Sequence, residues 1–281
     1  MHGYSFREMA HGVLERVLVN QDQMIDGATG THVSVPLPLK SVRNVRDLGG
    51  YPFTAENGAR GTTAFRAFVR AGSLRGINAG DIEALRQYGV RRIVDLRSPF
   101  ELKHMPDDFS RGRRHDFEYV SVPMLDQLNS SGFGDALPER MSDVYIQLLD
   151  EDADDIRTAM EALDGEGASL FHCRAGKDRT GVIAMLLLGL AGVDDDFIVA
   201  DYEVSDRYMG HGLQAQRLLV SLVLRKRAPK CLFESNPEEM RQALAHLHTT
   251  YGTARTYLHQ KAACDPNLLD RLTRKLQGTS N

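Results

Sequence analysis

The sequence has little of what marks several large classes of protein. It holds only three cysteines, Cys173, Cys231 and Cys264, which are too few and too scattered for a disulfide framework and favour a reducing compartment. Its longest apolar run, Val182 to Ala191, is too short to span a bilayer, and residues 1–20 lack the continuous apolar core of a secretory signal. We therefore expect a cytoplasmic protein without an integral membrane segment, and we leave export without a visible signal open.

The sequence also lacks an excess of basic residues. Its 34 lysines and arginines stand against 38 acidic residues, and the net charge of -4 argues against general binding to nucleic acid or to membrane surfaces. No internal repeat or low-complexity tract is present, and a hydrophobic content of 42% is ample for a sizeable core. The 281 residues suffice for one large domain or two small ones. The oligomeric state stays open.

One segment, from His172 to Gly181, joins two apolar runs. The run before it, residues 168–171, predicts a buried strand, and the run after it, residues 182–191, predicts a buried helix. Amide groups in such a loop, together with the positive end of the helix dipole, form an anion site. The same positive field stabilises a thiolate on Cys173, and Arg179 offers a planar fork for two phosphate oxygens. A nucleophile and a phosphate cradle therefore share one loop.

This loop does not have the pattern of a metal site. His172 and Cys173 are adjacent, so they lie on opposite faces of a strand end, and no second Cys or His pair has ligand spacing. The loop itself supplies the positive charge that a phosphoryl group requires. We therefore expect neither a metal ion nor another cofactor.

The Cys-x5-Arg-Thr-Gly pattern from Cys173 resembles the phosphate loop of cysteine-dependent phosphatases. The fuller string His-Cys-x-Ala-Gly-Lys-Asp-Arg-Thr-Gly resembles one branch, the atypical bacterial and fungal tyrosine phosphatases, which include lipid phosphatase-like and virulence-type members. Asn-x-Arg-Asp-x-Gly-Gly at residues 44–50, Asp-Leu-Arg-Ser at residues 95–98 and Tyr-x-x-Ser at residues 202–205 are similar to strings of the same family. The resemblance covers roughly residues 40–260.

The resemblance implies a phosphomonoester hydrolase that works through a phosphocysteine. Cys173 would attack phosphorus, while Arg179 and the loop amides would hold the equatorial oxygens. Thr180 could donate its hydroxyl to the thiolate, and His172 would face the core and orient the loop. The residues expected to bind the phosphate lie in the same loop: Arg174, Ala175, Gly176, Lys177 and Thr180.

The leaving oxygen of such a reaction needs a proton. Many cysteine phosphatases supply it from an aspartate on a separate upstream loop, and the candidates here are Asp126, Asp135 and Asp143, none of which sits in a recognisable motif. The branch resembled here carries an aspartate within the phosphate loop. We therefore expect Asp178 to be the general acid.

The resemblance implies a phosphorylated protein or a phosphoinositide as substrate. Phosphotyrosine is our leading expectation, and we leave activity on phosphoserine and phosphothreonine open. Lys177 and Arg174 make the loop more cationic than phosphotyrosine requires, and a lysine at this position is typical both of this branch and of phosphoinositide phosphatases. A phosphate-binding pseudophosphatase and a sulfur-transfer enzyme are alternatives, disfavoured because Cys173, Asp178 and Arg179 are all present and a helix follows the Arg-Thr-Gly.

Strands and helices alternate upstream of the loop, which predicts an α/β fold. We expect strands at residues 64–71, 92–98 and 118–123 and a helix from Asn78 or Asp81 to Tyr88, closed by Gly89. The resemblance implies the cysteine-phosphatase fold, a central, mostly parallel, twisted sheet flanked by helices. Ligands bind beyond the carboxyl ends of the strands of such sheets.

Four polar residues on neighbouring strands and loops are expected to support or reach the site. Asp95 and Arg97 either contact substrate or pair with each other to lock a loop behind it. Asp47 either stabilises a turn or faces substrate, and Arg70 at its strand end could reach the site.

The rest of the chain reads as helices at residues 141–149, 153–163, 194–209, 213–224, 237–251, 253–263 and 266–276. Residues 1–39 are interpreted as an N-terminal extension, which could begin with an amphipathic helix, and residues 40–281 as a single phosphatase domain. Residues 124–138 are rich in Gly and Ser and predict a flexible loop. Some relatives cover their active site with a helical lid, and residues 205–245 are the candidate here.

Overall fold

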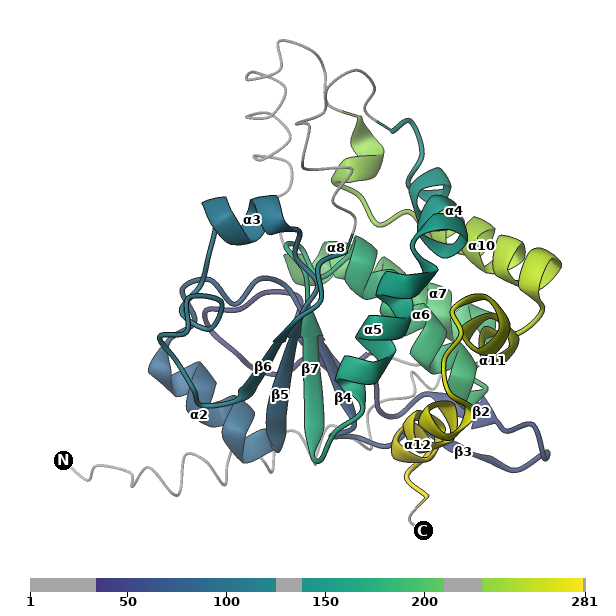
Figure 1. The fold of residues 1–281 in the computed structure, drawn as a ribbon, viewed down its shortest axis with the longest axis horizontal. Helices are drawn as coiled ribbons and strands as arrows, with labels where there is room; N and C mark the ends of the chain where they lie inside the picture. Colours follow the sequence, from purple (N-terminus) through teal and green to yellow (C-terminus); the bar gives the residue numbers. More distant parts are fainter. Residues whose placement is uncertain (1–33, 125–137, 210–228, 280–281) are drawn as a thin grey trace.

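Five strands form the central sheet of the structure, a computed structural model that describes residues 34–124, 138–209 and 229–279 (Figure 1). Their order across the sheet is β1 (Arg46–Asp47), β4 (Phe68–Ala71), β7 (Ala168–His172), β5 (Val90–Asp95) and β6 (Glu118–Ser121). The last four run parallel, and β1 pairs antiparallel with β4. A separate hairpin pairs β2 (Pro52–Thr54) with β3 (Arg60–Thr62). The predicted α/β fold with a mostly parallel sheet is confirmed.

Helices cover both faces of this sheet (Figure 1). On one face α2 packs with residues of β4, β5 and β7 in one hydrophobic cluster, and on the other α5 and α6 lead a larger cluster. The helices are α2 (Ala79–Tyr88), α3 (Pro99–His104), α4 (Met141–Glu151), α5 (Ala153–Leu163), α6 (Asp178–Ala191), α7 (Asp195–Glu203), α8 (Ser205–Met209), α10 (Pro237–His246), α11 (Ala254–Thr256) and α12 (Pro266–Gln277). A 3-10 turn, η2 (Lys230–Leu232), and two π-helical turns, η3 (Leu247–Tyr251) and η4 (Tyr257–Lys261), complete the described elements.

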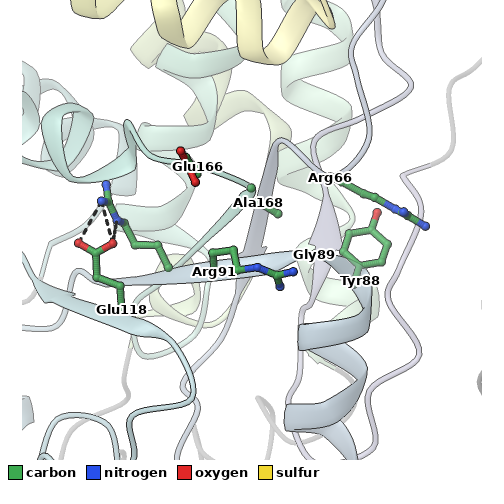
Figure 2. A pocket seen from close by; sticks show the side chains of 9 residues that line it. Arg66, Tyr88, Gly89, Arg91, Glu118, Glu166 and Ala168 are labelled. Carbon is green, nitrogen blue, oxygen red and sulfur yellow. Dashed lines mark hydrogen bonds and ion pairs between the residues drawn. The ribbon is translucent and has the colours of Figure 1, made fainter.

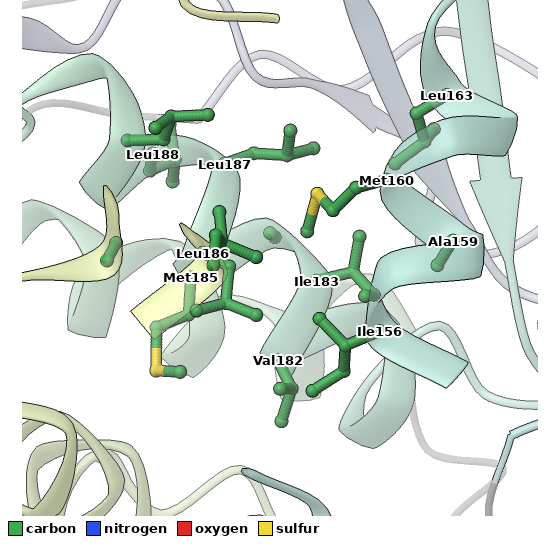
Figure 3. Packing of buried hydrophobic residues seen from close by; sticks show 14 of the residues in the cluster. Ile156, Ala159, Met160, Leu163, Val182, Ile183, Met185, Leu186, Leu187 and Leu188 are labelled. Carbon is green, nitrogen blue, oxygen red and sulfur yellow. The ribbon is translucent and has the colours of Figure 1, made fainter. Parts of the chain in front are cut away.

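Side-chain periodicity explains how β7 and α6 occupy the centre. In β7, Ala168 and Leu170 belong to the α2 side of the core, while Phe171 belongs to the α6 side, as alternation along a strand requires. The helix α6 is apolar around most of its circumference, and its residues from Val182 to Leu188 are all buried. Figure 3 shows Ile183 on the side of α6 that faces Ile156 and Met160 of α5, while Met185 lies on the side away from α5.

Helix ends follow the sequence signals. The Asn78 side chain accepts from the Asp81 amide at the start of α2, and Gly89, with φ of 106°, ends the helix. Asp194 caps α7 in the same way. The strands are shorter than predicted: β4 begins only at Phe68, because Arg66 has a left-handed φ of 65°. The strand predicted at residues 92–98 ends at Asp95, because Ser98 leaves the sheet to cap α3.

Some predicted features fall outside the described residues: the amphipathic helix within residues 1–20, nearly all of the loop at residues 124–138 and the helix at residues 213–224. The candidate lid is described only in part, as α8, η2 and α10, and Met240, Ala243 and Leu244 of α10 are buried in the main core. Among the helices that are described, none combines the length and hydrophobicity needed to cross a membrane.

Candidate active site

The parallel strands bring three loops to one edge of the sheet. Ala71 of β4 and Asp95 of β5 both lie level with His172 of β7. The residues that follow these strand ends, among them Gly72 and Cys173, therefore gather at the carboxyl edge, where α/β sheets bind their ligands. The predicted phosphate loop lies in this position.

The loop folds around the sulfur of Cys173. This side chain is 2% exposed, and the Gly176 amide donates a hydrogen bond to its Sγ at 3.3 Å. Gly176 has a φ of 70°, and a β-carbon at this position would overlap the backbone of Ala71 and Gly72. Only glycine therefore lets the loop lie this close to β4 with an amide directed at the sulfur.

Arg179, in the first turn of α6, is held in place by a carboxylate. Its Nη1 and Nη2 donate to Glu101 Oε2 and Oε1 at 2.6 and 3.0 Å, and Nη1 also donates to Leu96 O at 3.2 Å. Burial alone would lower the pKa of Arg179, but the charges of Cys173 and Glu101 and the hydrogen bonds to Glu101 raise it. The guanidinium is thus a permanent cation near the sulfur, and two of its donors are fixed by a fork-to-fork pair.

Side chains from β4 and from the segment of Asn44 and β1 hold the loop from behind. Asn44 Nδ2 donates to the carbonyls of Ala175 and Gly176 at 3.1 and 2.9 Å, and Arg70 Nη2 donates to the Gly176 carbonyl at 2.8 Å. Arg46 Nη1 in turn donates to Asn44 Oδ1 at 2.5 Å. These bonds hold the loop carbonyls on one side, while the Gly176 amide donates to the sulfur on the other.

Asp201 of α7 neutralises the two buried arginines of this network. Its carboxylate accepts from Arg46 Nε at 2.8 Å, from Tyr51 OH at 2.9 Å and from Arg70 Nη1. Burial would raise the pKa of Asp201, but the charges of Arg46 and Arg70 and these hydrogen bonds lower it to about 2. The carboxylate is therefore ionised at any pH at which the protein would work.

Asp178 lies at the start of α6, with its side chain 26% exposed. Its Oδ1 accepts from Tyr145 OH at 2.6 Å and lies 3.3 Å from Lys177 Nζ. Of the upstream alternatives, Asp143 is exposed on α4, while Asp126 and Asp135 lie outside the described residues. The geometry is compatible with Asp178 as the general acid, which stays a prediction.

The side chain of Lys177 differs from our expectation of a phosphate ligand. It is 1% exposed, and its ammonium donates to the carbonyls of Cys231 and Glu234, both at 3.0 Å. Together with the Asp178 contact, these bonds commit the charge to protein groups. Arg174, by contrast, is exposed and close enough to Glu101 to help lower the pKa of that carboxylate, against the effect of burial.

Asp95 and Arg97 form a closed pair behind the site. Arg97 donates to Asp95 Oδ1 and Oδ2 at 2.9 and 2.6 Å and to Asp107 Oδ2 at 2.5 Å, and all three side chains are buried. His172 Nδ1 lies 3.2 Å from the Cys173 carbonyl, and its Nε2 lies 3.7 Å from Asp95 Oδ2. Of the two alternatives for the Asp95–Arg97 pair, these contacts favour the locking role. His172 is buried, and its expected role in orienting the loop stays a prediction.

One group of metal-ligand type appears in this network. Asp95, Asp107 and His172 place ligand atoms within 4.8 Å of one another. Arg97, however, already bonds both carboxylates, so its guanidinium takes the place that a cation would need. The donors therefore do not fit a metal ion as they stand.

Asp47 stabilises a turn and does not reach the loop in any described contact. It accepts from the Gly49 amide at 2.6 Å, from the Arg66 amide at 2.9 Å and from Tyr88 OH at 2.7 Å. Burial raises its pKa to about 6, although these hydrogen bonds and the charge of Arg66 oppose the rise. The turn-stabilising alternative for Asp47 therefore applies, because its partners lie toward the opposite end of the sheet.

A cleft of about 650 Å³ opens at that opposite end (Figure 2). Gly89 and Ala168, at the amino ends of β5 and β7, line it. Its Arg92 is committed to Glu118 through hydrogen bonds of 2.9 and 3.0 Å, drawn as dashed lines in Figure 2. The cleft is separate from the phosphate loop, and its size alone does not make it the active site.

The expected bond from Thr180 to the thiolate is not formed. Its Oγ1 is buried and has no hydrogen-bond partner among the residues that the structure describes. The sulfur instead receives the Gly176 amide. The expected role of Thr180 as a donor to the thiolate therefore stays a prediction.

Several functional residues were not assigned a role from the sequence. Glu101, Asn44, Tyr145 and Asp201 each contact the loop or a residue that holds it. Asn44 stood in a family-like string that could have drawn attention to it. Glu101 follows Ser98 at the spacing of a capping box, which predicts a helix start and gives no sign of a second bond to Arg179.

The chain is similar in sequence to a known protein family and to several of its members. The sequence model of the tyrosine phosphatase family matches residues 37–278. A tyrosine-protein phosphatase of Nostoc commune is 36% identical over 145 residues, which cover 51% of this chain and 49% of that protein. A Cupriavidus necator protein named for the same activity is 33% identical over 180 residues, which cover 61% of this chain and 63% of that protein.

Two further comparisons are more distant. The triple specificity protein phosphatase PtpB of Mycobacterium tuberculosis is 28% identical over 188 residues, 56% of this chain and 68% of that protein. The crystal structure of TpbA from P. aeruginosa overlaps 83% of this chain and 98% of its own at 16% identity, with a TM-score of 0.29, too low to bear on the site. The chain thus spans between about half and two thirds of the length of the curated relatives that it matches.

Proposed function

The chain belongs to the tyrosine phosphatase family, whose model it matches over residues 37–278, and on that basis we propose that it is a protein-tyrosine phosphatase that forms a phosphocysteine on Cys173. The observation that carries the proposal is the loop itself. The buried Cys173 sulfur accepts a hydrogen bond from the Gly176 amide. The guanidinium of Arg179 lies near it and is held in place by Glu101. A nucleophile and its charge stabilisation are thereby preorganised before substrate arrives.

In the first step the Cys173 thiolate attacks phosphorus in line with the leaving oxygen. The Sγ–P bond forms as the P–O bond to that oxygen breaks, and Asp178 gives its proton to the departing oxygen. Arg179 and the loop amides hold the three equatorial oxygens, which carry the charge of the transition state. The product alcohol or phenol leaves neutral.

In the second step water attacks the phosphocysteine. The ionised Asp178 takes a proton from the water as the new P–O bond forms and the Sγ–P bond breaks, so inorganic phosphate and the thiolate are regenerated. The Thr180 hydroxyl, buried without a partner among the described residues, would turn toward the sulfur and donate to it as it leaves. No step requires a group other than these residues and water.

Phosphotyrosine is favoured over phosphoinositides by two features of the site. The Lys177 ammonium, which would serve a polyanionic head group, is buried and bonded to two carbonyls. Phe100 is 42% exposed in the same short helix as Glu101, and it is the only large hydrophobic side chain that is exposed among the described residues. An exposed aromatic ring next to the residue that holds Arg179 suits a phenyl ring.

Broad specificity is the second candidate. The relative PtpB is named a triple specificity phosphatase, and Arg174 leaves one exposed cation at the loop. Phosphoserine, phosphothreonine and phosphoinositide substrates are therefore included in the test. A pseudophosphatase is disfavoured, because the nucleophile, the arginine and the candidate acid are all present.

The experiment measures phosphate release from a phosphotyrosine peptide, a phosphoserine peptide and a short-chain phosphoinositide. Cys173→Ser should abolish release. Cys264→Ser is the matched control, because Cys264 is buried in the connection between η4 and α12 and burial raises its pKa to about 11, which keeps it an inert thiol. We expect the phosphotyrosine peptide to be the best substrate. Phosphate release that persists in Cys173→Ser would overturn the proposal, and so would a wild-type protein that releases no phosphate from any of the three substrates.

A further inference from the structure

Two buried tyrosines stand in line behind Asp178. Tyr145 of α4 reaches Asp178 Oδ1 at 2.6 Å, and Tyr202 of α7 lies 2.7 Å from the Tyr145 oxygen. Their side chains are 0% and 1% exposed, and the two rings meet edge to face at 5.9 Å. Both hydroxyls are therefore held by packing, and α4, α6 and α7 together fix their positions.

The direction of these hydrogen bonds follows from counting protons. Burial and the neighbouring charge of Asp178 raise the pKa of Tyr145 well above its ordinary value, so its hydroxyl keeps its proton. An ionised carboxylate can only accept. Tyr145 must therefore donate to Asp178, and its oxygen is left to accept from Tyr202.

The two oxygens of Asp178 are in different surroundings. Oδ1 receives the Tyr145 hydroxyl and lies 3.3 Å from the Lys177 ammonium. Within residues 34–124, 138–209 and 229–279, no group hydrogen-bonds to Oδ2, and the side chain is partly exposed. A donor and a cation at Oδ1 disfavour a proton there, so a protonated Asp178 carries its proton on Oδ2.

From this geometry we infer that Tyr145 is a positioning residue for the chemistry: its bond to Oδ1 orients Asp178 so that Oδ2 delivers the proton to the leaving oxygen. Tyr202 fixes the Tyr145 hydroxyl and has a smaller share in the same role. The inference rests on the proposed phosphatase function and deepens it, because it assigns the acid step to an oriented carboxyl group.

The test compares leaving groups. p-Nitrophenyl phosphate has a good leaving group that needs little help from an acid, whereas phenyl phosphate has a poor one. Tyr145→Phe removes one oxygen atom and keeps the ring. We expect it to lower kcat on phenyl phosphate by roughly 10- to 100-fold, the worth of a hydrogen bond to a charged group. The loss on p-nitrophenyl phosphate should be under about 3-fold, since acid assistance matters little there.

Three variants separate this role from a loss of structure. Tyr257→Phe is the matched control, because Tyr257 is also fully buried but donates to the Leu149 carbonyl, and it should leave the ratio of the two kcat values unchanged. Tyr202→Phe should shift the ratio in the same direction as Tyr145→Phe, but less. In an Asp178→Asn background, Tyr145→Phe should cause no further shift of the ratio.

An unchanged ratio in both Tyr145→Phe and Tyr202→Phe would overturn the inference while the phosphatase function stands. A full additional shift in the Asp178→Asn background would overturn it as well. If phosphate release from either substrate survives Cys173→Ser, the proposed function itself fails, so the two failures are told apart.

Discussion

Asp201 balances two guanidiniums in the interior, and replacing it with Asn leaves both without a counter-charge. Arg46 and Arg70 are fully buried, and each contacts the Asp201 carboxylate. The same two arginines hold the phosphate loop, one directly through Gly176 and one through Asn44. The stability of this network therefore bears on the geometry of the site.

The size of the effect can be worked from the charges. The pKa of Asp201 falls from an ordinary 3.8 to about 2, a preference of the folded state for the ionised form worth about 2 kcal/mol. Removing one partner of a buried ion pair typically costs about 3–5 kcal/mol, because the remaining charge stays in the interior. The Asn side chain keeps an acceptor for one arginine, so we expect Asp201→Asn to lower the free energy of unfolding by about 3 kcal/mol.

Urea denaturation followed by far-UV circular dichroism measures this loss at pH 7. Glu203→Gln is the control: it makes the same chemical change two residues further along α7, at an exposed position, and should alter stability by less than about 0.5 kcal/mol.

The contribution of Asp201 to stability depends on pH in a definite direction. Because the pKa of Asp201 is lowered in the folded protein, its contribution to the free energy of unfolding is complete above pH 3.8. It is lost as the pH falls through about 2. The gap between wild type and Asp201→Asn should therefore narrow below pH 3.8. A loss under about 1 kcal/mol at pH 7, or a gap that does not narrow, would refute the reasoning.

Three further predictions concern the loop, its arginine and the turn behind the sheet. Gly176→Ala should lower turnover by at least about 100-fold while the circular dichroism spectrum stays native, because the added β-carbon overlaps the backbone of β4; wild-type turnover would contradict this. Glu101→Gln should lower kcat roughly 10- to 100-fold, since Arg179 loses a charged partner, and an unchanged kcat in steady-state assays would show that the pair is dispensable. Folding raises the pKa of Asp47 from 3.8 to about 6, so its contribution to the free energy of unfolding is complete below pH 3.8. That contribution is lost as the pH rises through about 6, and the loss amounts to about 3 kcal/mol in all. Asp47→Asn should flatten this part of the stability profile between pH 4 and 7 in urea titrations, and a profile parallel to that of the wild type would rule the explanation out.

The part of the site that is contiguous in the chain could be predicted from the sequence. The run from His172 to Gly181 lies between a buried strand and a buried helix, so its local setting follows from neighbouring residues. The parallel sheet then placed Asp95 and Arg97 at the same edge, as the strand pattern indicated. Both depend on short-range patterns that a single sequence displays.

The partners that hold the loop could not be predicted in this way. Glu101 and Arg179 are 78 residues apart, and Arg46 and Asp201 are 155 apart, so their pairing depends on how the layers pack. The direction of the Lys177 side chain depends on carbonyls 54 and 57 residues away. The position of Lys177 in the motif therefore predicted a phosphate ligand, whereas the tertiary structure gives its ammonium group two backbone carbonyls as partners. The division at residue 39 and the identity of the general acid remain predictions.

The central claim is that Cys173 becomes phosphorylated during turnover. Mixing the protein with a phosphotyrosine peptide, quenching in acid within the first turnover and digesting the product allows mass spectrometry of the peptide that contains residue 173. We predict that this peptide gains the mass of one phosphoryl group in the wild type, and more of it in Asp178→Asn if the water step also needs the carboxylate. Phosphate release without any labelled Cys173 peptide, under quench conditions that preserve a phosphocysteine, would contradict the account.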